Sequence, residues 1–228
     1  MNGRIVEQTR MRAGIARRMV ESKQQAPHFY VQTEVAVDPV RDAIAALNED
    51  ADADAPRVTM SAALVVASAA ALRAHPMFNS VWTKDGLLQA DEINVGIAIA
   101  LDDGLVAPAL LGADSLDLRG AASALRDLAE RARAMRLRPA EISGATFTLS
   151  NLGMFDVTAF VAIVTPPQVA ILATARTVER WTGDGRRGML TATLSADHRA
   201  VDGADAARFL ETFKHALEDP ATLMKEAM

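Results

Sequence analysis

The segment from Asp197 to Gly203 places an imidazole and a carboxylate four residues apart, at His198 and Asp202. An apolar run precedes this segment and a helix-like pattern follows it, so His198 is expected at the end of a strand. A histidine in that position can point into a cleft and transfer a proton near neutral pH. Taken alone, the pattern also fits a surface turn with an incidental histidine and an acidic residue that starts a helix.

Ser150 is a second candidate, in the segment Leu149-Ser150-Asn151-Leu152-Gly153 at the end of another predicted strand. With His198 and Asp202 it suggests a hydrolase triad, but the Gly-x-Ser-x-Gly elbow of such enzymes is absent from this segment. A serine at a strand end before glycine is also a common turn residue. A hydroxyl near His198 could act as a nucleophile or as a hydrogen-bond donor to an oxyanion. Spacing leaves both roles open.

Two cofactor patterns are weak. Gly183 to Gly188 match Gly-x-Gly-x-x-Gly, which binds dinucleotides only between a strand and a helix. A strand-like run follows it here, so the glycines predict a hairpin loop. The histidines lack the paired spacing of a metal site, and no metal is expected. They are His28, His75, His198 and His215.

Composition narrows the function classes further. The chain has 228 residues, 50% of them hydrophobic, a net charge of −5 and no cysteine. An acidic balance argues against nucleic-acid binding, and the lack of cysteine excludes disulfides and thiolate sites. No apolar run is long enough for a membrane span. The start of the chain, with Arg4, Glu7, Arg10 and Arg12, is too charged for a signal peptide, so a cytoplasmic location is expected.

The expected elements form one α+β domain, a mixed β-sheet flanked by helices, over residues 1–228. Strands and helices mix without a strict strand–helix–strand rhythm, which argues against a doubly wound sheet. Thr9 is expected to cap the first helix, Asp38 the second, and Asp202 to start the last. Helices are expected at 9–24, 38–47, 60–74, 118–135 and 202–217. Strands are expected at 28–37, 80–83, 87–89, 94–101, 146–150, 169–174 and 189–196, with turns at 85–86 and 102–104.

Several collinear segments resemble the catalytic domain of the dihydrolipoyl acyltransferases, the core components of 2-oxo acid dehydrogenase complexes. The likeness runs from about Thr9 to Met224, nearly the whole chain. The segments are Ile15-Ala16-Arg17-Arg18-Met19, Ser22-Lys23, Pro27-His28, Asn94-Val95-Gly96-Ile97-Ala98, Gly104-Leu105-Val106-Ala107-Pro108, Thr146–Phe155, Pro166–Leu172, Asp197-His198-Arg199 and Asp202-Gly203.

The resemblance implies a chloramphenicol acetyltransferase-like fold, trimeric, with active sites between neighbouring subunits. Coenzyme A, a substrate, would enter from one side and a lipoyl group from the other. It implies that His198 is the general base and Ser150 the oxyanion donor, from adjacent subunits. It also implies a buried pair of Asp202 and Arg18 that, with Gly203 of the motif, supports the His198 turn. Asp202 is therefore expected to be structural, with a triad role as the alternative.

The chemistry of that assignment is consistent. A thiol is mostly protonated at pH 7, and the thiolate is the nucleophile. Neutral His198 would remove the proton as the sulfur attacks a thioester, and Ser150 would donate to the tetrahedral oxyanion. Imidazolium would then return the proton to the departing sulfur. No acyl-enzyme is required, because transfer between two thioesters is nearly balanced.

Some features depart from the family. No lipoyl or peripheral-subunit-binding domain is expected in this sequence, so the lipoyl group and the other complex components would act in trans. We therefore expect either an excised core or a natural stand-alone acyltransferase. Asp156, Ala196 and Ala107 differ from common family residues, which leaves the acyl group open. The protein is expected to form a trimer or a larger assembly of trimers. The alternatives are acyl transfer from coenzyme A to another small acceptor and a non-catalytic core that scaffolds other enzymes. A plain hydrolase ranks last.

Overall fold

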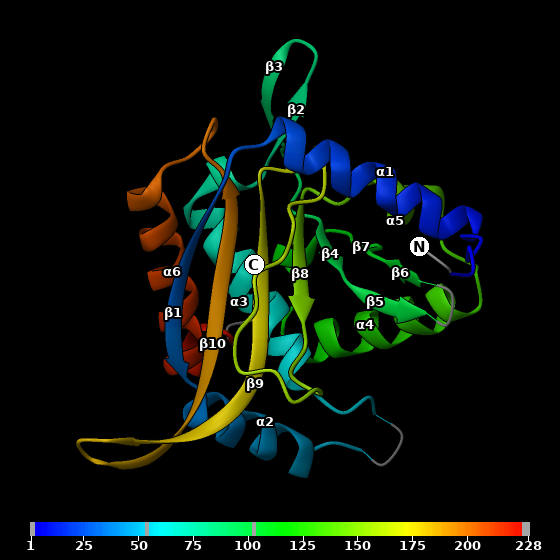
Figure 1. Ribbon diagram of the computed structural model, residues 1–228. Coiled ribbons are helices and arrows are strands. Elements are labelled where there is room, and N and C mark those ends of the chain that lie inside the picture. Colours follow the sequence, from blue (N-terminus) through cyan, green and yellow to red (C-terminus); the bar gives the residue numbers. More distant parts are fainter. Residues whose placement is uncertain (1–2, 53–54, 102–103, 225–228) are drawn as a thin grey trace.

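A six-stranded mixed sheet is the centre of the computed structural model, which describes residues 3–52, 55–101 and 104–224 (Figure 1). The strand order is β1-β10-β9-β8-β4-β7. β8 runs parallel to both of its neighbours, and the other pairs are antiparallel. The expected mixed sheet is confirmed. The strands are β1 (His28–Ala36), β10 (Gly185–Asp197), β9 (Ala170–Thr182), β8 (Phe147–Asn151), β4 (Val95–Ile97) and β7 (Ala109–Leu110).

Helices cover the sheet, with α3 and α6 packed against each other in one layer (Figure 1). α3 is apolar almost all round and is the most buried helix, as its sequence predicts. Phe209 of α6 is fully buried, and its ring centroid lies 4.8 Å from that of Phe78 and 5.6 Å from that of Phe147. The helices are α1 (Arg10–Gln25), α2 (Asp38–Glu49), α3 (Met60–Ala74), α4 (Leu118–Arg133), α5 (Pro139–Ser143) and α6 (Gly203–Glu218), with 3-10 turns at Pro76–Phe78, Ala113–Ser115 and Pro220–Thr222.

β1 forms one edge of the sheet, and α6 packs along it. The ammonium of Lys214 donates to the carbonyl of Glu34 at 3.0 Å. The amide of Ala36 donates to the carboxylate of Glu218 at 2.9 Å. Side chains of α6 therefore form hydrogen bonds with backbone groups of β1 that are not paired with another strand.

Most expected elements are confirmed within one or two residues, and α3 has the bounds that periodicity predicts. Thr9 caps α1 through its side chain, as expected. The glycine-rich segment is the tip of the β9–β10 hairpin, which extends well beyond the body of the molecule and is longer than predicted (Figure 1). The hairpin of β2 (Ser80–Thr83) and β3 (Gly86–Gln89) is also confirmed.

Two expectations are wrong. The single strand predicted at 94–101 is divided at Ala98, whose amide donates to the carbonyl of Leu149. The second half, β5 (Ile99–Leu101), leaves the main sheet and pairs with β6 (Gly104–Val106). Periodicity does not reveal this change of partner, because apolar residues continue through it. The turn expected at 102–104 falls largely on residues outside those described.

The second error is at the start of α2, where Val37, and not Asp38, is the N-cap residue. The carboxylate of Asp38 accepts from the amide of Gly188 on β10 at 2.9 Å instead. A contact distant in sequence thus replaces the local cap.

Within the described ranges, no helix is both long enough and apolar enough to cross a membrane. The same ranges hold no cluster of three or more side chains suited to a metal ion.

Candidate active site

His198 lies in the turn between β10 and α6, on the exposed surface at the end of the sheet where β1 begins. Its amide donates to the carbonyl of Pro27 at 3.0 Å, which fixes the turn against the residues before β1. Its imidazole packs on Phe29, with ring centroids 4.5 Å apart. Among the described residues, no side-chain hydrogen bond reaches this imidazole, so both ring nitrogens are free for a substrate.

Asp202 is the N-cap residue of α6, and the buried pair expected with Arg18 is wrong for this chain. The carboxylate of Asp202 accepts from the amides of Ala204 and Asp205, at 2.9 and 3.2 Å. These two backbone hydrogen bonds lower the pKa of Asp202. Arg18 is exposed on α1 and forms no ion pair with any described residue. The carboxylate faces its own helix because the amides of the first turn have no other partner.

Gly203 is the first residue of α6, and its surroundings are open enough for a side chain. Nothing in the described structure requires glycine there. The support expected from Arg18 and Gly203 for the His198 turn is therefore absent within the chain.

Ser150 lies near the end of β8 and lines a cavity of about 600 Å³. The cavity is mainly apolar, with Ile97, Leu125 and Phe155 among its lining residues, and Arg57, Arg126 and Arg133 add positive charge. The Ser150 hydroxyl forms no hydrogen bond to another residue in the described part of the chain. It is half-buried, so it remains accessible to a group that enters the cavity.

The sheet register separates Ser150 from His198. Ser150 pairs with Ala173, and Ala173 pairs with Thr193 of β10. His198 follows about five residues later, which is roughly 16 Å along the strand at ~3.3 Å per residue. Two strand spacings of ~4.8 Å add roughly 10 Å sideways, for a total of roughly 19 Å. Because reacting groups must meet at ~3 Å, one chain cannot bring both to one substrate carbon.

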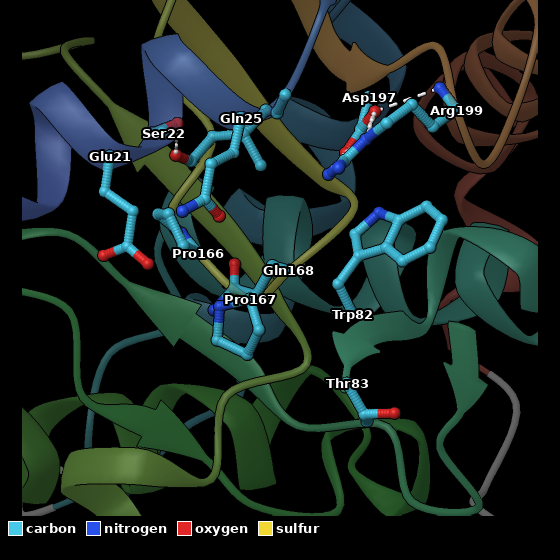
Figure 2. A pocket seen from close by; sticks show the side chains of 12 residues that line it. Glu21, Ser22, Gln25, Trp82, Thr83, Pro166, Pro167, Gln168, Asp197 and Arg199 are labelled. Atoms are coloured by element: carbon cyan, nitrogen blue, oxygen red, sulfur yellow. Dashed lines mark hydrogen bonds and ion pairs between the residues drawn. The ribbon is translucent and has the colours of Figure 1, made fainter. Parts of the chain in front are cut away.

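A second cavity, of about 290 Å³, lies beside the His198 turn between the end of α1, β2 and residues 164–168 (Figure 2). Asp197 and Arg199 line it, and Trp82 faces Arg199. Sequence reasoning included Asp197 and Arg199 in the motif without giving either a role. Opposite charges on both sides of His198 were the available signal, whereas nothing near Trp82 in the sequence connects it with this turn.

Two residues that depart from the family pattern have ordinary structural surroundings. Asp156 forms an ion pair with Arg176 at 2.8 Å and is largely exposed. Ala196 is fully buried, on β10 opposite Phe29. Its small side chain is part of the packed core, which favours repacking over a wider acyl pocket.

The family model described as 2-oxoacid dehydrogenases acyltransferase (catalytic domain) matches residues 2–225. The chain belongs to this family. The acyltransferase chain is 36% identical over 225 residues to the dihydrolipoyllysine-residue acetyltransferase component of the pyruvate dehydrogenase complex from Zymomonas mobilis, covering 97% of this chain and 51% of the relative. It is 39% identical to the mitochondrial component from Schizosaccharomyces pombe, covering 94% and 46%. The chain thus spans about half the length of these relatives.

Solved structures of the acyltransferase family have the same fold. A dihydrolipoamide acetyltransferase from Azotobacter vinelandii superposes with a TM-score of 0.93 at 30% identity, over 98% of this chain and 95% of that one. A probable dihydrolipoamide acetyltransferase from Listeria monocytogenes gives 0.88 at 31% identity, over 99% and 97%. A chloramphenicol acetyltransferase gives 0.62 at 14% identity over 88% and 94%, which supports the expected fold alone.

Proposed function

We propose that this chain transfers a short acyl group between a dihydrolipoyl thiol and coenzyme A, in a trimer or a larger assembly of trimers. The observation that carries the proposal is the placement of Ser150 and His198, two uncommitted groups roughly 19 Å apart in one chain. A site that uses both therefore takes them from two copies. A related solved structure is the cubic core of a pyruvate dehydrogenase complex, which is an assembly of many copies.

In the proposed reaction His198 is the general base and Ser150 the oxyanion donor. The exposed imidazole accepts the thiol proton as the sulfur attacks the acyl carbon of the thioester. The Ser150 hydroxyl donates a hydrogen bond to the oxyanion, at the point where negative charge develops. When the tetrahedral intermediate collapses, the imidazolium gives the proton to the departing sulfur. The proton count balances, and no metal or redox partner is needed.

The cavity at Ser150 suits coenzyme A as one of the two substrates. Its apolar walls fit a long, mostly neutral thioester arm, and an arginine guanidinium pairs well with phosphate oxygens. Arg57, Arg126 and Arg133 provide that charge. The oxygen of the thioester would then lie near Ser150, the one hydroxyl of β8 that lines the cavity.

The chain would also act as one domain within a larger complex. Residues 1–228 would form one catalytic domain, which receives a lipoyl group in trans and binds other components of a 2-oxo acid dehydrogenase complex. The motif at His198 and the family membership support this arrangement. The cytoplasmic location stays a prediction, and several relatives are named as mitochondrial.

Acyl transfer from a panel of acyl-coenzyme A donors to free dihydrolipoamide tests the proposal. His198→Ala is expected to lower turnover about 10²–10⁴-fold. Ser150→Ala is expected to lower turnover about 10²–10³-fold with little change in KM. The preferred donor would identify the acyl group. A folded protein that is inactive with every donor would refute the proposal and favour a scaffold, and activity only with a hydroxyl or amine acceptor would favour the other branch of the fold.

A further inference from the structure

We propose that Asp197, Arg199 and Trp82 form a clamp that positions His198, in place of the absent pair of Arg18 and Asp202. The clamp rests on the proposed function, since it gives His198 the orientation that a general base needs. Arg199, Asp197 and Trp82 are positioning residues, because the reacting atoms would touch His198 and not the clamp.

The first arm of the clamp is a charge pair that spans His198 itself. Nε of Arg199 donates to both carboxylate oxygens of Asp197, at 3.0 and 3.1 Å, and Nη2 donates to Oδ2 at 2.5 Å. The backbone amide of Arg199 donates to Oδ1 at 3.0 Å. Asp197 is fully buried, so this dense hydrogen bonding compensates for the loss of water around its charge. The side-chain hydrogen bonds to Asp197 raise the pKa of the Arg199 guanidinium.

The second arm is the indole of Trp82, which stacks on the other side of Arg199. The guanidinium carbon lies 4.4 Å from the ring centroid, within the range of a cation–π contact. Figure 2 shows Arg199 between the carboxylate of Asp197 and the face of Trp82. Trp82 is held in turn, because its amide donates to the carbonyl of Pro167 at 2.8 Å. The guanidinium therefore lies between a carboxylate and an indole that is attached to a fixed strand.

The clamp fixes the backbone on both sides of His198. The carbonyl of Asp197 accepts from the amides of Ala200 and Val201, at 3.0 and 3.3 Å. With the contact between His198 and Pro27, every amide from 198 to 201 has an acceptor. The imidazole packs on Phe29, and no side chain among the described residues holds it by a hydrogen bond, so its direction depends on the backbone that carries it.

The position of the pair argues for a role beyond stability. An ion pair between a buried carboxylate and a guanidinium that is still partly exposed, such as this one, adds little net stability. Here its two members flank the only exposed imidazole of the turn. A misplacement of ~1 Å costs on the order of 10²-fold in rate when reacting groups must align. The clamp is expected to have its largest effect on turnover.

The opposite charges of Asp197 and Arg199 cancel each other next to His198. Removing either side chain leaves a net charge there, and this makes the clamp testable. Among the described residues, the other charged or titratable groups around this turn include Asp202 at the start of α6, with Arg208 near it, and His28 at the start of β1. Glu21 of α1 lines the same cavity as Asp197 and Arg199. None of them changes in the variants proposed below. Arg199→Ala leaves a lone carboxylate beside His198 and should move the pH profile of acyl transfer to higher pH, whereas Asp197→Asn leaves a lone guanidinium and should move it to lower pH.

The experiment measures turnover, KM and the pH profile of acyl transfer for these variants. Arg199→Ala and Trp82→Ala are each expected to lose on the order of 10²-fold in turnover with little change in KM. Trp82→Phe should restore most of the rate, because it keeps an aromatic face. Arg199→Lys should lose turnover with an unmoved pH profile, because it keeps the charge without the planar fork.

Arg73→Ala is the control, since it removes another arginine–aspartate ion pair, a more exposed one with Asp114 at 2.9 Å, away from this turn. It should leave turnover unchanged. Thermal melting identifies variants that fail to fold. If the alanine variants do not fold, the conservative variants Arg199→Lys and Trp82→Phe still test the clamp. Wild-type turnover in both Arg199→Lys and Trp82→Ala would overturn the clamp. So would a loss of melting temperature with turnover unchanged.

A second measurement separates the clamp from the proposed function. The pH dependence of modification by diethyl pyrocarbonate, followed at the His198 peptide, reports the imidazole pKa without turnover. If the wild-type protein shows no acyl transfer, the proposed function is refuted, but the clamp is not. Opposite pKa changes in Arg199→Ala and Asp197→Asn would still support the clamp, and the absence of any change would overturn it.

Discussion

Mixing two inactive variants should restore activity, because Ser150 and His198 lie too far apart in one chain to serve one substrate. His198→Ala and Ser150→Ala are each expected to be about 10²-fold or more below wild type. When equal amounts are co-assembled, each site takes His198 from one copy and Ser150 from the next. About one quarter of the sites then receive both intact residues, for random mixing in a closed symmetric ring. The mixture should therefore reach roughly a quarter of wild-type turnover.

The assay is transfer to dihydrolipoamide after the two variants are unfolded and refolded together, compared with each variant refolded alone. Wild-type protein put through the same cycle gives the reference rate. A mixture no more active than its parents, although it assembles normally, would refute the separation inferred from the register. It would mean that the two residues act within one chain or that one of them is dispensable.

Three further perturbations test the fold and the helix ends. Phe209→Ala removes a fully buried ring that contacts two other phenylalanines, and should cost about 3–5 kcal/mol, or roughly 10 °C in melting temperature. Glu141 is buried, and hydrogen bonds from Arg131 lower its pKa. Its contribution to stability is present above its pKa in the unfolded chain and is lost as pH falls through the lower folded value, so Glu141→Gln should flatten the acid side of a stability-versus-pH curve. Asp202→Ala should lower the melting temperature, whereas Asp202→Asn should retain most of it, because asparagine also caps helices.

Each of these results has a clear contrary outcome. A melting temperature unchanged in Phe209→Ala would contradict the packed aromatic cluster. Equal acid sensitivity of wild type and Glu141→Gln would show that the pair with Arg131 adds no stability. A larger loss for Asp202→Asn than for Asp202→Ala would show that the carboxylate does more than accept from the first turn of α6.

Local patterns predicted what depends on neighbours in sequence. Thr9 caps α1 and α3 has its predicted length, because capping and helical periodicity act over a few residues. Asp202 likewise starts α6 as expected. The division of 94–101 depends on which strand each half meets, and an apolar run does not contain that information. Asp38 illustrates the same limit, since its partner Gly188 lies on a distant strand.

The candidate site was also predictable only in part, because the sequence reveals local motifs but not contacts between distant segments. Motif spacing and resemblance drew attention to His198 and Ser150, and the structure places both where a substrate can reach them. The pair of Arg18 and Asp202 came from resemblance alone and is not formed within this chain. Trp82 could not be connected with the His198 turn, because contacts between β2 and residues 167–169, distant in sequence, bring it there.

The contact between α6 and β1 has a consequence for solubility. An uncovered edge strand is a template on which further strands can add, and it leads to uncontrolled association. At the Glu34–Ala36 end of β1, Lys214 and Glu218 occupy a backbone oxygen and a backbone amide that an added strand would need. An incoming strand must first displace two charged side chains and then leave them without their partners. The protein can therefore associate with its own copies through other surfaces while this end of the sheet stays closed to indefinite growth.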